Sequence, residues 1–131
     1  MPIKFTIVKE RNYFIAKWED KINDAEIIEA YREFFEGDEW VPGMNELADF
    51  SQSNLADVKS QAFERLGQYI HKIYKENNMA NMKCASYAPE DLAFGLLRLY
   101  ELITDDDSPE TTKVFKNIDE AEQWLISLNT R

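Results

Sequence analysis

The alternation of short strand-like runs with longer helix-like segments constrains the fold more than any other feature of the sequence. Residues 3–8 alternate apolar and polar side chains, and residues 12–18 are rich in aromatic and β-branched side chains. These two runs predict a hairpin. Helix-like and strand-like segments then take turns: a helix from 23, a strand at 44–50, a helix from 54 or 57 to 76, a strand at 82–88, a helix at 92–103, a strand at 111–116 and a last helix from 117.

An opening hairpin followed by repeated strand–helix units defines the fold class. Such a chain forms a mixed sheet with helices packed on it. We therefore predict an α/β fold with the element order ββαβαβαβα. We find no linker, repeat or low-complexity tract, so a single domain over residues 1–131 is expected.

Capping residues indicate where several of these helices begin and end. Gly37 is expected to end the first helix in the left-handed conformation. Pro89 suits the first position of the third helix, where no backbone N–H is needed. Two pairs have the spacing of a capping box: Asn23 with Glu26, and Asn117 with Glu120.

The charge balance narrows the classes of partner. The net charge is −10, from 25 acidic and 15 basic residues, and no basic stripe is present. Nucleic-acid binding depends on clustered Lys and Arg, so we expect no nucleic-acid partner. The longest apolar stretch, residues 92–100, is far shorter than the roughly 20 residues of a membrane helix. With no signal-peptide pattern at the N-terminus, a cytoplasmic protein without membrane insertion is expected.

Residues capable of chemistry are few and carry no motif. Cys84 is the single cysteine and lies mid-strand, so we predict a buried, structural thiol and no disulfide. No metal-binding or nucleotide-binding motif is present, and the consecutive acids at 105–107 are expected to be solvated. His71 is the only histidine; catalysis would need a serine or a carboxylate brought beside it by the fold, and otherwise it is a surface or boundary residue. We predict no enzyme, no metal and no cofactor.

The helix at 92–103 has an unusually wide apolar face. Such a helix is either buried on two sides by its own domain, or lines a pocket for an apolar ligand or an interface, including that of a homodimer. Gly95 inside it favours close packing. The apolar residues are Leu92, Phe94, Leu96, Leu97, Leu99, Tyr100, Leu102 and Ile103.

Four segments of the chain have a familiar pattern: IAKWEDKIN (15–23), AYREFFEGDEWVPGMNELADFS (30–51), APEDLAFGLLRLYELI (88–103) and TTKVFKNIDEAEQWL (111–125). Together they resemble the SpoIIAA-like family of STAS/SEC14 domains, which is related to the anti-sigma-factor antagonists. The similarity lies in apolar positions and turns over nearly the whole chain. It implies the STAS-like fold and a non-enzymatic regulatory domain.

The same resemblance points to one surface segment. Antagonists of this kind carry an acid at the end of the third strand and, after a loop, an Asp-Ser-Ser-Gly-like motif whose first serine is phosphorylated by a partner kinase. Asp49 matches the first acid and Asp57 the motif's acid, but Val58 stands at the phosphoserine position and no glycine follows. The resemblance thus implies a partner-binding surface formed by Asp49, Ser51, Ser53, Asp57, Val58, Lys59 and Ser60.

Two functional hypotheses follow. The first is a STAS-like regulatory domain that acts through a protein partner at residues 51–60. The alternative is a carrier or sensor of a small apolar, lipid-like ligand, which the SEC14 side of the resemblance implies and which the helix at 92–103 would contact. Self-association through the same helix is a further expectation.

Overall fold

The computed structural model describes residues 2–103 and 108–127, apart from the side chains of residues 100, 102 and 103. The predicted order ββαβαβαβα is confirmed, with a short 3₁₀ helix, η1, in the first hairpin. The strands are β1 (Ile3–Val8), β2 (Tyr13–Lys21), β3 (Asn45–Asn54), β4 (Met82–Tyr87) and β5 (Glu110–Phe115), and the helices are η1 (Lys9–Arg11), α1 (Asp24–Glu36), α2 (Ser60–Glu76), α3 (Asp91–Ile103) and α4 (Ile118–Ile126).

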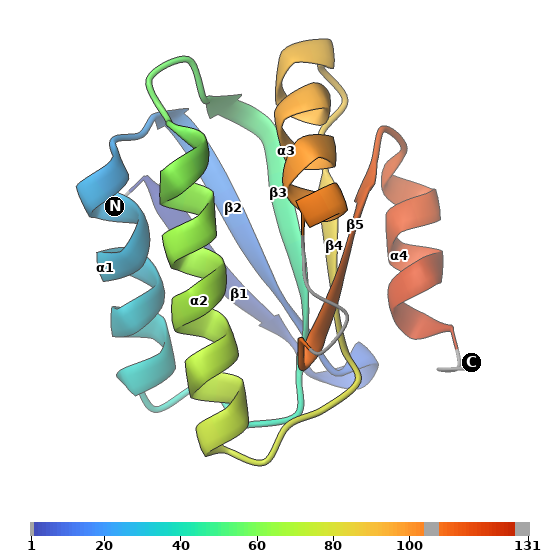
Figure 1. The fold of residues 1–131 in the computed structure, drawn as a ribbon. Coiled ribbons are helices and arrows are strands. Elements are labelled where there is room, and N and C mark those ends of the chain that lie inside the picture. Colours follow the sequence, from blue (N-terminus) through green and yellow to red (C-terminus); the bar gives the residue numbers. More distant parts are fainter. Residues whose placement is uncertain (1, 104–107, 128–131) are drawn as a thin grey trace.

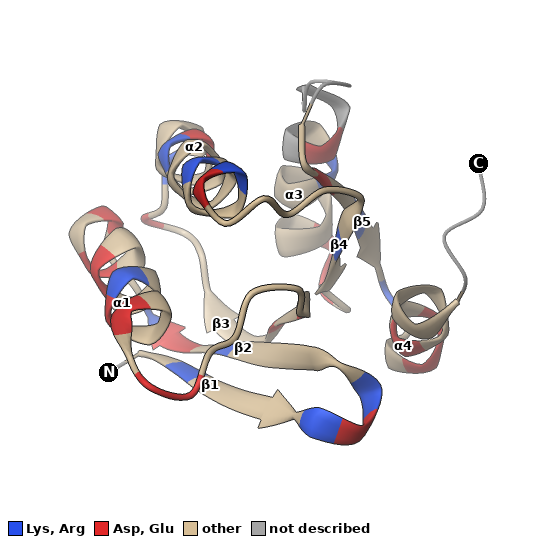
Figure 2. Cartoon of the chain, turned by 90° about the horizontal axis from the view of Figure 1, so that it is seen from below, with Lys and Arg blue, Asp and Glu red and all other residues tan. Residues whose placement is uncertain are grey.

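The strands form one mixed sheet in the order β1-β2-β3-β4-β5. β1 pairs antiparallel with β2, and every later pair is parallel. Helices α1, α2 and α3 cover one face of the sheet and α4 covers the other (Figures 1 and 2). Among the described residues, no helix is both long and apolar enough to span a membrane.

The larger of two hydrophobic cores lies between the sheet and helices α1 to α3. Trp18 is fully buried at its centre and stacks on Phe63 of α2, with ring centroids 5.8 Å apart. The smaller core lies under α4, where Ala121 and Leu125 pack against the strands. Successive strand residues point to opposite faces, so each central strand contributes to both cores.

The predicted N-terminal capping box of α1 is present, whereas the predicted left-handed glycine at its C-terminus is not. Asn23 Oδ1 accepts from the backbone N–H of Glu26, and Glu26 Oε1 accepts from that of Asn23, both at 3.0 Å. Gly37 is not left-handed as predicted: its φ is −78°, and its N–H donates to the carbonyl of Phe34. The helix therefore ends in a tight turn that needs no left-handed residue, although a Cβ at position 37 would lie only 3.3 Å from the carbonyl oxygen of Glu33.

Helix α2 begins at Ser60, later than either start that the pattern predicts. Asn54 still belongs to β3, where it pairs with Lys21 of β2. Its side chain accepts from the N–H of Ala56 at 3.0 Å and so begins a turn that precedes the helix. Strand pairing, which depends on a distant part of the chain, thus overrides the local helix signal.

Helix α3 begins at Asp91, so Pro89 precedes it and does not occupy its first position. The reason is a contact of the preceding residue: the N–H of Ala88 donates to the carbonyl of Phe115 at 2.8 Å. That bond extends the association of β4 with β5 by one residue and delays the turn into the helix.

Candidate functional site

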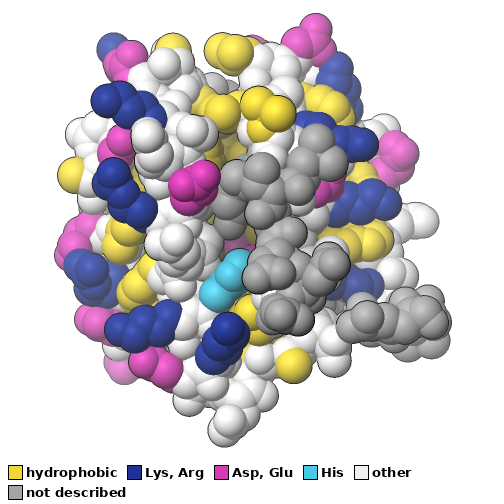
Figure 3. All heavy atoms as spheres, in the orientation of Figure 1, with side chains coloured by type: hydrophobic (Ala, Val, Ile, Leu, Met, Phe, Trp, Pro, Cys, Tyr) yellow, Lys and Arg dark blue, Asp and Glu magenta, His cyan; other side chains and the backbone are white. Residues whose placement is uncertain are grey.

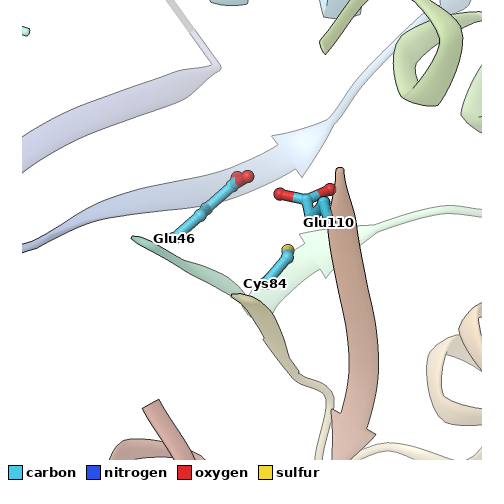
Figure 4. Close-up of side chains that lie close together, drawn as sticks. All are labelled: Glu46, Cys84 and Glu110. Atoms are coloured by element: carbon cyan, nitrogen blue, oxygen red, sulfur yellow. The ribbon is translucent and has the colours of Figure 1, made fainter. Parts of the chain in front are cut away.

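Three side chains capable of metal or proton chemistry meet beneath helices α2 and α3. Glu46, Cys84 and Glu110 are each more than nine-tenths buried, and one ligand atom from each lies within 4.8 Å of the other two. Figure 4 shows the two carboxylates and the thiol pointing toward one another from β3, β4 and β5. Glu46 and Cys84 are register partners, so the pairing of the parallel strands places them side by side.

Glu46 is held by a chain of hydrogen bonds in this site. Tyr31 of α1 donates its hydroxyl proton to Glu46 Oε2 at 2.5 Å, and Trp18 Nε1 donates to the Tyr31 oxygen at 3.3 Å. Burial, and then the negative charge of Glu110, raise the pKa of Glu46 to about 8. At neutral pH, Glu46 is therefore mainly the protonated partner of a carboxylate pair.

Unsatisfied polar atoms lie in the same place. Within the part of the chain that the structure describes, neither Glu110 Oε2 nor the Tyr74 hydroxyl has a partner at full hydrogen-bond geometry, although the two side chains interact with each other. Tyr74 is fully buried, and the charge of Glu110 adds to burial in raising its pKa. Burial also raises the pKa of the Cys84 thiol, so this thiol is un-ionised at neutral pH.

His71 borders the cluster and has the neighbours that catalysis would require. Its Nε2 lies 3.0 Å from Ser108 Oγ and 3.8 Å from Glu110 Oε1. The serine hydroxyl, however, donates to the Glu110 carbonyl at 2.8 Å and accepts from the Glu110 N–H at 3.1 Å. Its proton therefore points to the backbone and not to the imidazole. These two bonds form a local turn that leads into β5.

A cavity of about 40 Å³ adjoins these groups. Because one water molecule needs roughly 10–15 Å³ of such space, the cavity has room for a few waters. A lipid chain does not fit unless α2 and α3 move apart. The polar side of the lining includes Glu46, Cys84 and Glu110, and the apolar side includes Trp18, Phe50, Phe63, Leu66, Ile70 and Leu97.

The wide apolar face of α3 is divided between core and surface. Leu97 is 4% exposed and lines the cavity, and Ala93 is also buried. Leu92 and Leu99 are 70% and 63% exposed. The domain therefore does not bury the helix on two sides, while Phe94 and Leu96 pack partly against the core. The side chains of Tyr100, Leu102 and Ile103 lie outside the described residues.

The segment that resembles the antagonists' switch is held by local hydrogen bonds. Asp49 Oδ1 accepts from the N–H of Ser51 at 2.9 Å, and Ser53 Oγ donates to the carbonyl of Phe50 at 2.8 Å. Val58 is buried in the larger core. A buried valine offers a partner no surface, so Val58 contributes to the packing of the larger core.

The exposed end of this segment carries charge. Asp57 forms an ion pair with Lys21 at 2.8 Å, and both side chains are exposed. Lys59 caps α2 without a side-chain hydrogen bond, and Ser60 is the first residue of that helix.

The acidic pair in the cluster is the part that the sequence pattern does not reveal. Glu110 lies just before the strand that the sequence predicts at 111–116, whereas β5 begins at it. The acids at 105–107 lie outside the described residues. Glu46 is the only signal: it is a charged residue inside the apolar run that forms β3. Cys84 is buried, as predicted.

Comparison with known proteins defines the class of fold. No family model matches the sequence, and no curated protein matches it. The structure, with its mixed sheet and four longer helices, is similar to a SpoIIAA-like fold. One similar solved structure is an uncharacterised protein of the DUF3478 family from Shewanella loihica PV-4, with a TM-score of 0.56 and 19% identity, over 94% of this chain and 91% of that one. At this identity the likeness establishes the fold alone.

Proposed function

We propose that the chain is a non-enzymatic regulatory domain of the cytoplasm that acts by binding a protein partner. The observation that carries the proposal is the exposure of Leu92, 70%, at the edge of the sheet where the 51–60 segment also lies. Helices α2 and α3 both begin at this edge (Figure 1). We call the surface formed by residues 51–60 with Leu92 and Leu99 the α2–α3 edge.

The composition of the α2–α3 edge resembles that of a protein interface. Such interfaces combine an apolar centre with a polar rim. Figure 3 shows hydrophobic side chains gathered toward the top of this face, over α2 and α3. Asp57, Lys59 and Ser60 are exposed close to the start of α2 and supply the rim. An exposed leucine pair on one helix is a suitable anchor for a partner or for a second copy of this chain.

A pair of matched substitutions tests this proposal. Val41 is 55% exposed in the loop between α1 and β3, at the opposite edge of the sheet. A partner is first captured by cross-linking in the host, then purified and titrated against each variant. We expect Leu92→Asp to weaken its binding about tenfold or more and Val41→Asp to leave it unchanged. Equal binding by wild type and both variants would show that the partner does not bind at the α2–α3 edge.

A second candidate function is the binding of a small apolar ligand. The apolar side of the cavity favours it, since Phe50, Phe63 and Leu97 all face the space. The cavity has room for a few waters only, so such a ligand requires α2 and α3 to separate. Native mass spectrometry of protein from its host tests this: a constant adduct lost in Leu97→Trp supports it, and a bare chain contradicts it.

A further inference from the structure

We propose that Glu46, Cys84 and Glu110 form a binding site for a divalent transition-metal ion of the zinc type. This inference is independent of the proposed partner binding, because the site lies inside the domain and the α2–α3 edge is outside it. It differs from the sequence expectation of no metal, which rested on the absence of local motifs. The three ligands come from three strands, so no local motif would reveal them.

The donor set suits zinc. Zn²⁺ binds thiolate, imidazole and carboxylate ligands, whereas Mg²⁺ and Ca²⁺ take oxygen ligands. Tetrahedral zinc with bonds of about 2.0–2.3 Å places its ligand atoms roughly 3.3–3.5 Å apart. The three donor atoms lie within 4.8 Å of one another. Side-chain rotations that close the group by about 1 Å complete three positions of a tetrahedron.

An unpartnered buried oxygen points to a missing ligand. Glu110 is 5% exposed, and its Oε2 makes no hydrogen bond to any described residue. A buried polar atom without a partner costs roughly 1–3 kcal/mol, and more when it is charged. A bound cation satisfies this oxygen. The Tyr74 hydroxyl interacts with the Glu110 carboxylate without a hydrogen bond of full geometry, so it can donate instead to a water on the ion's fourth position.

The surroundings supply the outer shell that metal sites need. Ligating carboxylates are themselves hydrogen-bonded in such sites. Tyr31 donates to Glu46 Oε2, which leaves the other oxygen of that carboxylate for the ion. The Nε2 atom of His71 lies 3.8 Å from Glu110 Oε1, and the His71 side chain is partly exposed, so one side chain separates the cluster from solvent there.

The binding step balances with the release of two protons. Before the ion binds, Glu46 and the Cys84 thiol keep their protons at neutral pH, because burial raises the pKa of both groups. Binding of Zn²⁺ forms bonds to one oxygen of each carboxylate and to the sulfur, and the protons of Glu46 and Cys84 leave to solvent. The site then carries three negative ligands against two positive charges.

Cobalt titration of chelator-treated, tag-free protein tests the proposal. Cys84 is the single cysteine, so a thiolate-to-cobalt charge-transfer band reports this residue alone. Zinc affinity is measured by calorimetry on wild type, Cys84→Ser, Glu46→Gln and Glu64→Gln, the last an exposed acid of α2. Circular dichroism checks that each variant is folded. Glu46→Gln is expected to fold, because a glutamine resembles the protonated glutamate in shape and in its ability to accept from Tyr31.

We expect one zinc ion per chain and a cobalt–thiolate band that Cys84→Ser abolishes. Zinc affinity should fall at least about tenfold in folded Glu46→Gln, which is the usual effect of replacing a residue at a metal site. It should stay unchanged in Glu64→Gln. The proposal is overturned if wild type shows no cobalt–thiolate band. It is equally overturned if Cys84→Ser and Glu46→Gln bind zinc as tightly as wild type, since the ion then binds elsewhere.

Discussion

The hydroxyl of Tyr31 lies 2.5 Å from Oε2 of Glu46 and links helix α1 to strand β3 in the interior of the domain. Both residues are almost fully buried. The tyrosine therefore gives a partner to one of two carboxylates that three adjacent strands bring together. This contact connects the packing of α1 to the electrostatics of the buried cluster.

Replacement of Tyr31 by phenylalanine should destabilise the domain. The ring keeps its packing, but Glu46 Oε2 loses its donor, which costs about 1–3 kcal/mol of unfolding free energy. Urea unfolding followed by fluorescence measures the change. Tyr69→Phe, on a half-buried tyrosine of α2, serves as the control. An unchanged midpoint for Tyr31→Phe would show that the bond adds nothing to stability.

The metal-free domain should become less stable as the pH rises from about 4.5 to about 8. Burial holds the pKa of Glu46 near 8, against an ordinary value of 4.5. Between these values the folded state keeps a proton that the unfolded state releases, so rising pH favours unfolding. The slope reaches at most about 1.4 kcal/mol per pH unit. Urea unfolding with a chelator present, at several pH values, measures it.

Glu46→Gln provides the matched comparison for this pH dependence. Glutamine does not titrate, so the fall in stability between pH 5 and 8 should flatten in the variant. At pH 8 the variant should equal or exceed wild type in stability. A slope that is the same in both proteins would assign the effect to another group.

Lys83 should anchor α4 to the sheet. Its buried Nζ donates to the carbonyls of Trp124 at 2.9 Å and Ser127 at 3.0 Å, near the end of that helix. Because bonds from a charged donor contribute about 1.5–3 kcal/mol, Lys83→Met should speed hydrogen exchange in α4. Lys113→Met, at an exposed lysine of β5, is the control. Equal protection of α4 in both variants would contradict this role.

Truncation of two leucines of α3 should change the stability of the protein by very different amounts. Leu97→Ala removes a buried side chain and should cost about 2–5 kcal/mol. Leu99→Ala changes an exposed residue and should stay within about 0.5 kcal/mol. Thermal or urea unfolding separates the two. Equal losses would mean that the helix is covered on both sides in solution, for example by a second copy of the chain.

Local signals predict the parts of the fold that local physics controls. The strand–helix alternation gives the element order, and the spacing of Asn23 and Glu26 gives a capping box that is present. The late starts of α2 and α3 follow from bonds to distant residues: Asn54 pairs with Lys21, and Ala88 bonds to Phe115. Such bonds cannot be deduced from neighbouring residues.

The buried cluster escapes prediction for a related reason. Glu46, Cys84 and Glu110 are brought together by the register of three parallel strands, which no single segment encodes. The serine beside His71 is likewise 37 residues away in sequence. Only the position of Glu46 within an apolar run hints at the cluster. The partner surface at residues 51–60 stays a prediction, although the structure places its charged end at the surface.

One measurement tests the existence of a metal site in the buried cluster most directly. Crystals grown with zinc chloride are measured at the zinc absorption edge, and an anomalous difference map locates each ion. We expect one strong peak at bonding distance from Cys84 Sγ and from a carboxylate oxygen of both Glu46 and Glu110. A map with peaks on surface acids alone, or with none, would contradict it and leave the cluster as a proton-sharing pair beside a structural thiol.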